Sequence, residues 1–179
     1  MRLDRYTAGD FDRGAPRWKE ALWLMVNGLL LSSWLPGSGW RRWLLLAFGA
    51  QIAPRVVFKP GVRVKFPWRL SVGMHSWIGE DVWIDNLAPV SIGAHVCLSQ
   101  GAYLCTGSHD WSRPNFDLIC LTITIEDHVW VGARASVAPG TILREGAVLA
   151  MSSFGQGELS SWIVHTGCPA LPKKQRPRM

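Results

Sequence analysis

The sequence predicts an all-β protein wound as a parallel β-helix, with a short helical segment before it and one projecting loop. Large apolar residues recur every six positions through most of the chain. A small or β-branched residue stands four positions after nearly every one of them. Neither the 3.6-residue period of an α-helix nor the alternation of a simple strand generates this rule. A coil of three short strands does, because each hexad then supplies one flat side.

The large residues of the repeat form four runs. They are Ile52, Phe58 and Val64; Val72, Ile78 and Ile84; Ile92, Leu98 and Leu104; and Ile125, Val131, Val137, Leu143 and Leu149. We expect each to point into the coil, while its small partner fits where the wall bends; Trp68 is the one large partner. Gly73, Gly79, Gly93 and Gly132 directly follow four of these residues, and we expect turns with positive φ there. Strands of stacked coils would pair in parallel about 4.8 Å apart.

The longest gap between runs predicts the projecting loop. Leu104 and Ile125 are 21 residues apart, which is three hexads plus three residues. One coil should therefore open into a loop at about 107–121, and this loop contains most of the stretch CTGSHDWSRPNF, residues 105–116. Loops that project from rigid scaffolds often carry function.

The two ends of the chain break the repeat. Residues 18–35 and 41–49 are expected as two helices joined by PGSG at 36–39. We therefore divide the chain into a helical appendage at 1–50, a β-helix domain at 51–170 and a basic tail at 171–179. Cys168-Pro169 and Pro172 are expected to end the regular structure.

Residues 21–35, ALWLMVNGLLLSSWL, are the one candidate for a membrane segment. They number 15, whereas a helix needs about 20 apolar residues to span a bilayer. The 20 mostly polar residues before them argue against a signal peptide. A helix docked on the rest of the protein is the better interpretation. Flanking basic residues and tryptophans leave peripheral contact with the inner membrane surface open.

Charge and cysteine usage restrict the partners. The 179 residues fit one domain, and a net charge of +6 favours an anionic partner such as a nucleic acid, a membrane surface or a phosphorylated cofactor. The sequence contains no motif that interleaves aromatic and basic residues, so we expect no nucleic acid. The four cysteines lack CxxC spacing, which favours reduced thiols and a cytoplasmic protein.

Several segments resemble one family. IGEDVWIDN at 78–86, LSQGAYLCTGSHD at 98–110 and PNFDL at 114–118 resemble the sugar O-acetyltransferases of exopolysaccharide clusters, nearest the colanic-acid biosynthesis acetyltransferases. FGAQIAP at 48–54 and FPWRL at 66–70 resemble the entry segments of that family. The resemblance implies a left-handed β-helix, although general crossover rules favour the right hand. It also implies acetyl transfer from acetyl-CoA to a saccharide acceptor, no metal, and a homotrimer with sites between subunits.

The resemblance assigns His109 as the general base. A sugar hydroxyl is a poor nucleophile while it keeps its proton, and an imidazole with a pKa near 6.5 removes that proton during attack. Such a base accelerates the reaction roughly 10²–10⁴-fold. Asp85 and Asn86 occupy positions where related enzymes bind acceptor hydroxyls. We group Asp110 with these substrate residues and consider it as a partner that orients the imidazole.

The cofactor residues also follow from the resemblance. The backbone N–H of Ala133, within VWVGARA at 129–135, would stabilise the negative oxygen of the transition state. The residues expected along acetyl-CoA are Trp130, Ala133, Ala150, Met151, Lys173, Lys174 and Arg176, the last three as partners of its phosphates. Two departures weaken this match: Leu171 and Pro172 stand where related enzymes often have a basic residue, and the regular repeat fails at 154–159.

Two other functions stay open at this point. A β-helix can serve as a non-catalytic scaffold or binding protein, and γ-class carbonic anhydrases share the fold. His75, His95 and His128 each stand three residues after the first large residue of a coil, so they should stack on one face. Histidines stacked about 4.8 Å apart on successive coils are poorly placed to bind one zinc ion together, because zinc holds its nitrogen ligands at about 2.0–2.1 Å. The identity of the sugar does not follow from the sequence.

Overall fold

Three parallel sheets wind around one apolar core in the computed structural model, which describes residues 3–6, 9 and 11–178. The first sheet contains β1 (Gln51–Ile52), β4 (Leu70–Val72), β7 (Val90–Ile92), β12 (Ile123–Ile125), β15 (Ile142–Leu143) and β18 (Glu158–Leu159). The second contains β2 (Val57–Phe58), β5 (Trp77–Ile78), β8 (Cys97–Leu98), β13 (Trp130–Val131), β16 (Val148–Leu149), β19 (Ile163–Gly167) and β20 (Ala170–Gln175). The third contains β3 (Arg63–Val64), β6 (Trp83–Asp85), β9 (Tyr103–Cys105), β14 (Ser136–Val137) and β17 (Phe154–Gly155).

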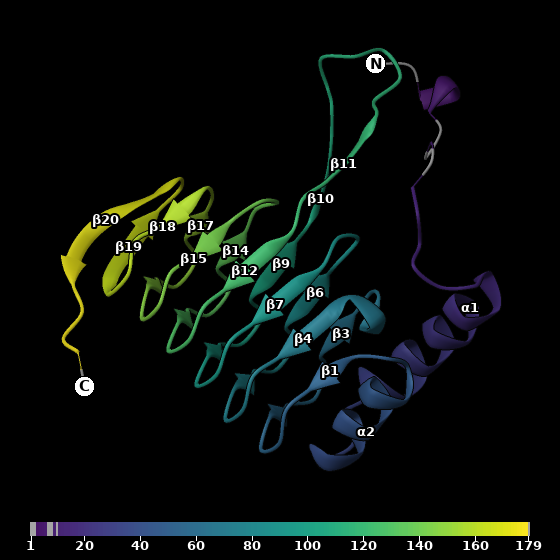
Figure 1. Cartoon of the computed structure of the whole chain (residues 1–179), viewed down its shortest axis with the longest axis horizontal. Helices are drawn as coiled ribbons and strands as arrows, with labels where there is room; N and C mark the ends of the chain where they lie inside the picture. The colour runs from purple at the N-terminus through teal and green to yellow at the C-terminus, as the bar shows by residue number, and fades with distance from the viewer. Residues whose placement is uncertain (1–2, 7–8, 10, 179) are drawn as a thin grey trace.

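Consecutive strands enter successive sheets, so each coil adds one strand to each sheet (Figure 1). The pairs between coils are parallel and run in the register of the repeat, as in the pairing of Ile52 with Val72 and of Val72 with Ile92. All fourteen large residues of the repeat are buried. Of the residues four positions after them, all are buried except Trp68 and Ser108. Both stand where the repeat is interrupted, Trp68 in the 3-10 helix η3 (Pro67–Arg69) and Ser108 in the projecting loop. The parallel β-helix is confirmed.

The prediction of positive φ at the glycines after the large residues is wrong. None of these four glycines has a positive φ; the left-handed residue stands two positions later, as at His75, where φ is 59°. Glycine is needed for a different reason, which is the close stacking of the next coil. A Cβ at Gly73 would lie 2.5 Å from the backbone nitrogen of Ala94, and one at Gly132 would lie 2.5 Å from that of Met151.

The projecting loop is an antiparallel ribbon. β10 (Gly107–His109) pairs with β11 (Leu118–Cys120), and His109 lies opposite Leu118 in the register. The ribbon leaves the stack of coils on the side where the N-terminal segment with η1 (Leu3–Arg5) also lies (Figure 1). The loop expected at about 107–121 is therefore present, and its base is ordered by strand pairing.

The C-terminal residues remain regular beyond the expected end. β20 pairs antiparallel with β19, with Val164 opposite Lys174, so residues up to Gln175 belong to the second sheet. The prediction that Cys168-Pro169 ends the regular structure is wrong. These residues form the turn of a hairpin that adds β20 beside β19 at the end of the second sheet.

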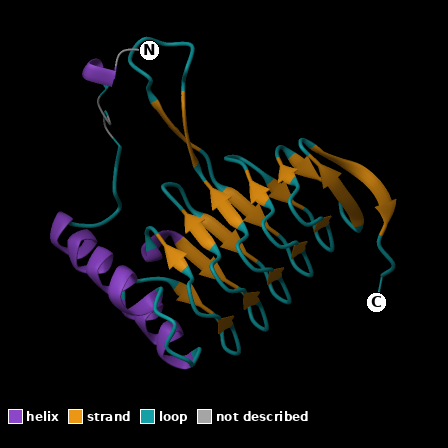
Figure 2. Cartoon of the chain, turned by 180° about the vertical axis from the view of Figure 1, so that it is seen from behind, coloured by secondary structure: helices purple, strands orange, loops and turns teal. Residues whose placement is uncertain are grey.

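Two helices cover the opposite end of the β-helix (Figure 2). α1 (Arg17–Val26) continues as the π-helical turn η2 (Asn27–Leu31), and α2 (Gly39–Ala47) follows. Trp23, Leu31 and Leu45 are fully buried in the core that includes the first coil, and the Trp23 indole donates to the Val64 carbonyl at 2.8 Å. No described helix is long and apolar enough to cross a membrane.

Arg41 explains why the first helix ends near residue 31 and not at residue 35. Its fully buried guanidinium donates to the carbonyl oxygens of Leu31, Ser33, Leu35 and Gly37 at 2.5–3.1 Å. Those carbonyls turn toward the arginine, which prevents them from continuing the helix. The end of a helix carries partial negative charge, so this position also compensates the buried cation.

Candidate active site

His109 stands at the end of β10 in a defined tautomer. Its Nδ1 lies 2.9 Å from the carbonyl oxygen of Phe116. A carbonyl accepts hydrogen bonds and does not donate them, so Nδ1 carries a proton. In the neutral ring the basic lone pair therefore lies on Nε2, which makes no hydrogen bond to any described residue.

Phe116 holds the imidazole in a second way. The two rings stack with centroids 4.1 Å apart and planes 4° from parallel. The backbone of Phe116 has a φ of +54°, an unusual value for a residue with a bulky side chain. Sequence reasoning did not identify Phe116 as a site residue, although it lies within the family-like segment PNFDL. The edge of the Tyr6 ring also meets the imidazole, at 5.5 Å between centroids.

Asp110 makes no hydrogen bond to the imidazole within the described structure, so it does not take the orienting role considered for it. Its carboxylate accepts hydrogen bonds from the backbone nitrogen and the hydroxyl of Ser112 and forms an ion pair with Arg113 at 3.3 Å. The Ser112 hydrogen bonds, more than Arg113, lower the pKa of this carboxyl. Asp110 therefore stabilises the turn of its own loop, and the Phe116 carbonyl performs the orienting role.

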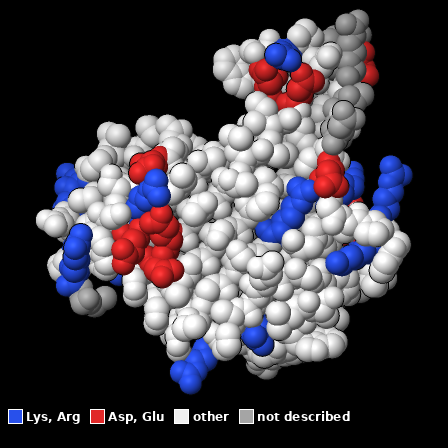
Figure 3. Space-filling view, in the orientation of Figure 1, with Lys and Arg blue, Asp and Glu red and all other residues white. Residues whose placement is uncertain are grey.

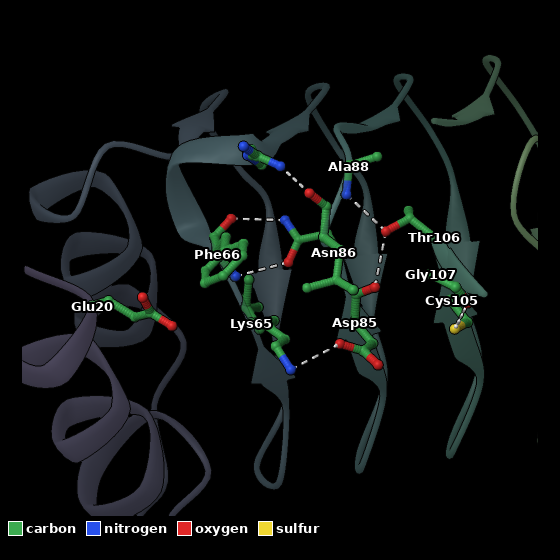
Figure 4. A network of polar contacts seen from close by, with 12 residues as sticks. Glu20, Lys65, Phe66, Asp85, Asn86, Ala88, Cys105, Thr106 and Gly107 are labelled. Atoms are coloured by element: carbon green, nitrogen blue, oxygen red, sulfur yellow. Dashed lines mark hydrogen bonds and ion pairs between the residues drawn. The ribbon is translucent and has the colours of Figure 1, made fainter. Parts of the chain in front are cut away.

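Asp85 lies on β6, beside Cys105 of the next coil. It accepts a hydrogen bond from the Tyr103 hydroxyl at 3.2 Å, and Lys65 lies 3.7 Å from its other oxygen, Oδ1 (Figure 4). Burial, followed by Cys105 and Asp85, raises the pKa of Tyr103, so the phenol keeps its proton and donates. Among the described residues, Oδ1 has no hydrogen-bond partner. The side chain as a whole is 17% exposed, so a ligand can still reach part of this carboxylate.

Asn86 has a structural role, and its prediction as an acceptor-binding residue is wrong. The side chain is fully buried, so an acceptor cannot reach it. Its Nδ2 donates to the Phe66 carbonyl at 2.7 Å, and its Oδ1 accepts from the Phe66 backbone nitrogen at 2.9 Å (Figure 4). The side-chain amide thus replaces backbone pairing where the coil is interrupted. Sequence position alone did not separate it from Asp85, because their directions alternate along the strand.

A groove of about 800 Å³ runs along the late strands of the second sheet. Six of the seven residues expected along acetyl-CoA line it: Trp130, Ala133, Ala150, Met151, Lys174 and Arg176. Lys173 is not among the lining residues. Lys173 and Lys174 are neighbours on β20, and successive side chains of a strand point to opposite faces. Ser99 and Gln100 also line the groove and were not expected.

Two polar features mark the groove. The Trp130 indole donates to the Ser99 hydroxyl at 2.9 Å, which fixes the ring plane along the wall. The backbone nitrogens of Gly132 and Arg134 donate to carbonyls of neighbouring coils. Within the described part of the chain, the nitrogen of Ala133 between them donates to no acceptor. It is therefore a fixed, unused donor.

Arg176 is already engaged within the chain. Its guanidinium donates to the carbonyls of His128 and Gly146 at 2.7 and 3.1 Å and lies over the Trp162 ring at 5.6 Å. These contacts anchor the end of the C-terminal strand. Lys174 is exposed and forms no such bond in the described structure, so it is the more available cation in the groove.

The three histidines expected to stack do so. His75 and His95 lie 5.0 Å apart between ring centroids, and His95 and His128 lie 5.2 Å apart, with the planes within 12° of parallel. Parallel rings in a column do not converge on one point. Over residues 3–6, 9 and 11–178, no three side chains of His, Cys, Asp or Glu are grouped to hold a metal ion.

His109 and the groove do not meet within one chain. His109 is not among the groove residues; its ribbon leaves the third sheet, whereas the groove lies on the second. A reaction that uses both the base and the groove therefore needs a second copy of the chain or a change in the ribbon.

Comparisons with known proteins identify chains of similar sequence and chains of similar fold. No protein-family model matches the chain. The chain is 36% identical over 166 residues to the colanic acid biosynthesis acetyltransferase WcaF of Escherichia coli strain K12. The aligned residues make up 92% of this chain and 91% of that protein. Its structure is similar to a hexapeptide-repeat acetyltransferase of Vibrio cholerae complexed with acetyl coenzyme A, with a TM-score of 0.77, 24% identity, and coverage of 98% of this chain and 97% of that chain. It is also similar to a galactoside acetyltransferase in complex with coenzyme A, with a TM-score of 0.80 and 19% identity. The match covers 98% of this chain and 91% of that chain.

Proposed function

Because the chain belongs to the hexapeptide-repeat acetyltransferases, in the family of the colanic acid biosynthesis acetyltransferases, we propose that it transfers an acetyl group from acetyl-CoA to a sugar hydroxyl of an exopolysaccharide precursor. One observation carries the chemical part of the proposal. The Nδ1 of His109 donates to the Phe116 carbonyl, so in the neutral ring the basic lone pair lies on Nε2, which makes no hydrogen bond within the described part of the chain. This is the form that a general base requires.

The proposed reaction proceeds in one attack and one proton return. Nε2 of His109 takes the hydroxyl proton while the sugar oxygen attacks the thioester carbon. The backbone N–H of Ala133 donates to the carbonyl oxygen as that oxygen becomes negative. The carbon–sulfur bond then breaks, and the imidazolium returns the proton to the CoA thiolate. Asp85, whose side chain is partly exposed, accepts a hydrogen bond from the acceptor sugar.

The groove supports acetyl-CoA as the donor. Its apolar walls, which include Val148, Met151 and Val164, suit the pantetheine arm, and Lys174 at its border suits a phosphate. The two structural neighbours named above were solved with coenzyme A or its acetyl form. A homotrimer in the cytoplasm, with the His109 of one subunit facing the groove of another, would bring together the two parts that one chain keeps apart.

A thiol-release assay tests the proposal. Acetyl-CoA is incubated with the protein and a panel of free sugars, nucleotide sugars and undecaprenyl-linked saccharides, and CoA release is followed. We expect release with at least one saccharide and a loss of about 10²–10⁴-fold in His109→Asn. Asparagine is the matched variant because its amide nitrogen can replace Nδ1 as the donor to Phe116, while no base remains. Absence of release with every acceptor, together with no CoA binding in calorimetry, would favour the non-catalytic scaffold.

A further inference from the structure

The two N-terminal helices and the segment that joins them expose a set of large apolar side chains. We call it the apolar end surface, and its residues are Trp18, Leu22, Leu24, Met25, Leu29, Leu30, Trp34, Leu35, Trp43 and Leu46. Four of them, at positions 18, 22, 25 and 29, follow at helical spacing and thus share one side of α1 and η2. Met25 is 62% exposed and Leu29 is 72% exposed.

The same helix is apolar on its inner side as well. Trp23 and Leu31 are fully buried against the β-helix, so the docking of the helix is already complete. A helix that is apolar all round normally has partners on both sides. Exposed apolar areas of this kind mark interaction sites in soluble proteins.

The charge around the apolar end surface identifies the kind of partner. Between residues 15 and 70 the sequence has one acidic residue, Glu20, which is paired with Arg13 at 2.7 Å. Of the nine basic residues in the same range, the exposed ones are Arg17, Arg55, Lys59 and Arg63. In Figure 3 the region of α1 and α2 is mostly white and is interrupted by blue side chains. Anionic lipid headgroups attract such a surface at about 1 kcal/mol for each basic residue near them.

We propose that the apolar end surface docks on an anionic lipid bilayer, with α1 and η2 lying in the plane of the headgroups. Tryptophans at positions 18, 34 and 43 are well suited to this interface, since Trp is enriched at headgroup level. Two copies of the chain that met through this surface would bring two strongly basic ends together, which like-charge repulsion disfavours. The inference does not rest on the proposed reaction.

Docking at this end orients the rest of the molecule. The helices cover the first coil, and the C-terminal strands lie at the far end of the stack (Figure 1). Asp85 belongs to the second coil, whereas the groove runs over the third coil and those after it. A docked protein would therefore keep the groove away from the lipid while Asp85 stays near it.

Vesicle co-sedimentation of the full chain tests the inference. The probes are vesicles of phosphatidylcholine mixed with phosphatidylglycerol and vesicles of phosphatidylcholine alone. We expect binding to the mixed vesicles that weakens with added salt. Met25→Glu should lower the partition coefficient about tenfold, because it replaces a methionine that the docked protein would bury in the bilayer by a charge. Met74→Glu is the matched control: Met74 is 50% exposed, lies on a turn of the β-helix, and gives the same change in net charge.

The outcomes distinguish a lipid bilayer from a second copy of the chain as the partner of the apolar end surface. Circular dichroism and the melting temperature verify that both variants are folded. A tenfold loss for Met25→Glu and little loss for Met74→Glu support the bilayer. No binding to either vesicle, or equal losses in the two variants, would overturn it. A change of oligomeric state in Met25→Glu by sedimentation velocity, without vesicle binding, would show instead that a second copy covers the surface.

Discussion

Replacement of Phe116 by glycine should separate activity from stability. The substitution removes the ring that stacks on His109 at 4.1 Å but keeps the carbonyl that accepts from Nδ1. An aromatic pair of this kind contributes about 0.5–1.5 kcal/mol. If that energy holds the imidazole in its reactive orientation, kcat/KM should fall about 2- to 13-fold.

The stability of the same variant should change little, because opposing effects nearly cancel. The φ of +54° at Phe116 costs about 1–2 kcal/mol for a residue with a side chain, and glycine adopts it freely. Glycine also gains about 0.5–1 kcal/mol of freedom in the unfolded chain, which offsets part of the relief. We therefore expect the free energy of unfolding to stay within about 1 kcal/mol of the wild type.

The assay is steady-state thiol release at saturating acetyl-CoA, with the melting temperature measured on the same preparations. Phe116→Leu is the companion variant, since it keeps a large apolar side chain without the ring stack. Unchanged kcat/KM in Phe116→Gly would show that the stack does not position the base. A loss as large as that of His109→Asn would show that the carbonyl bond fails together with the ring.

Three further predictions concern the core, the groove and the last coil. Gly73→Ala should lower the melting temperature by about 2–12 °C, because its Cβ would overlap the next coil at a cost of about 1–3 kcal/mol; Gly39→Ala, with nothing within 4 Å, should not lower it. Lys174→Ala should raise KM for acetyl-CoA about two- to fivefold, as expected for one exposed ion pair, and Lys173→Ala should leave KM nearly unchanged. Burial lowers the pKa of His165 below its usual 6.5, so the unfolded chain binds the extra proton and the free energy of unfolding should decrease as the pH falls below about 6.5. His165→Leu should remove this part of the pH dependence, which melting curves at about pH 5 and about pH 7.5 would show.

The repeat could be predicted because the period of six is a local property. Each large residue, such as Ile78, has the same relation to its own coil, so one rule describes fourteen buried positions. The interruption before Ile125 could be predicted for the same reason, since a missed period is visible without any contact. The environment of α1 could be predicted only in part. Its composition indicated either membrane contact or a helix docked on the protein, and the structure shows which side is docked.

The roles of individual site residues depended on contacts between segments that the repeat does not relate. Phe116 reaches His109 across the turn of a ribbon that has no period, and Asn86 bonds a backbone 20 residues earlier in the chain. Asp110 could be judged only when its hydrogen bonds to Ser112 were known. The sequence by itself therefore determined the β-helix and the place where its repeat is interrupted, because these follow from the size and spacing of side chains. Only the tertiary structure decided which polar groups are engaged and which are free, because hydrogen bonds depend on direction and distance in space.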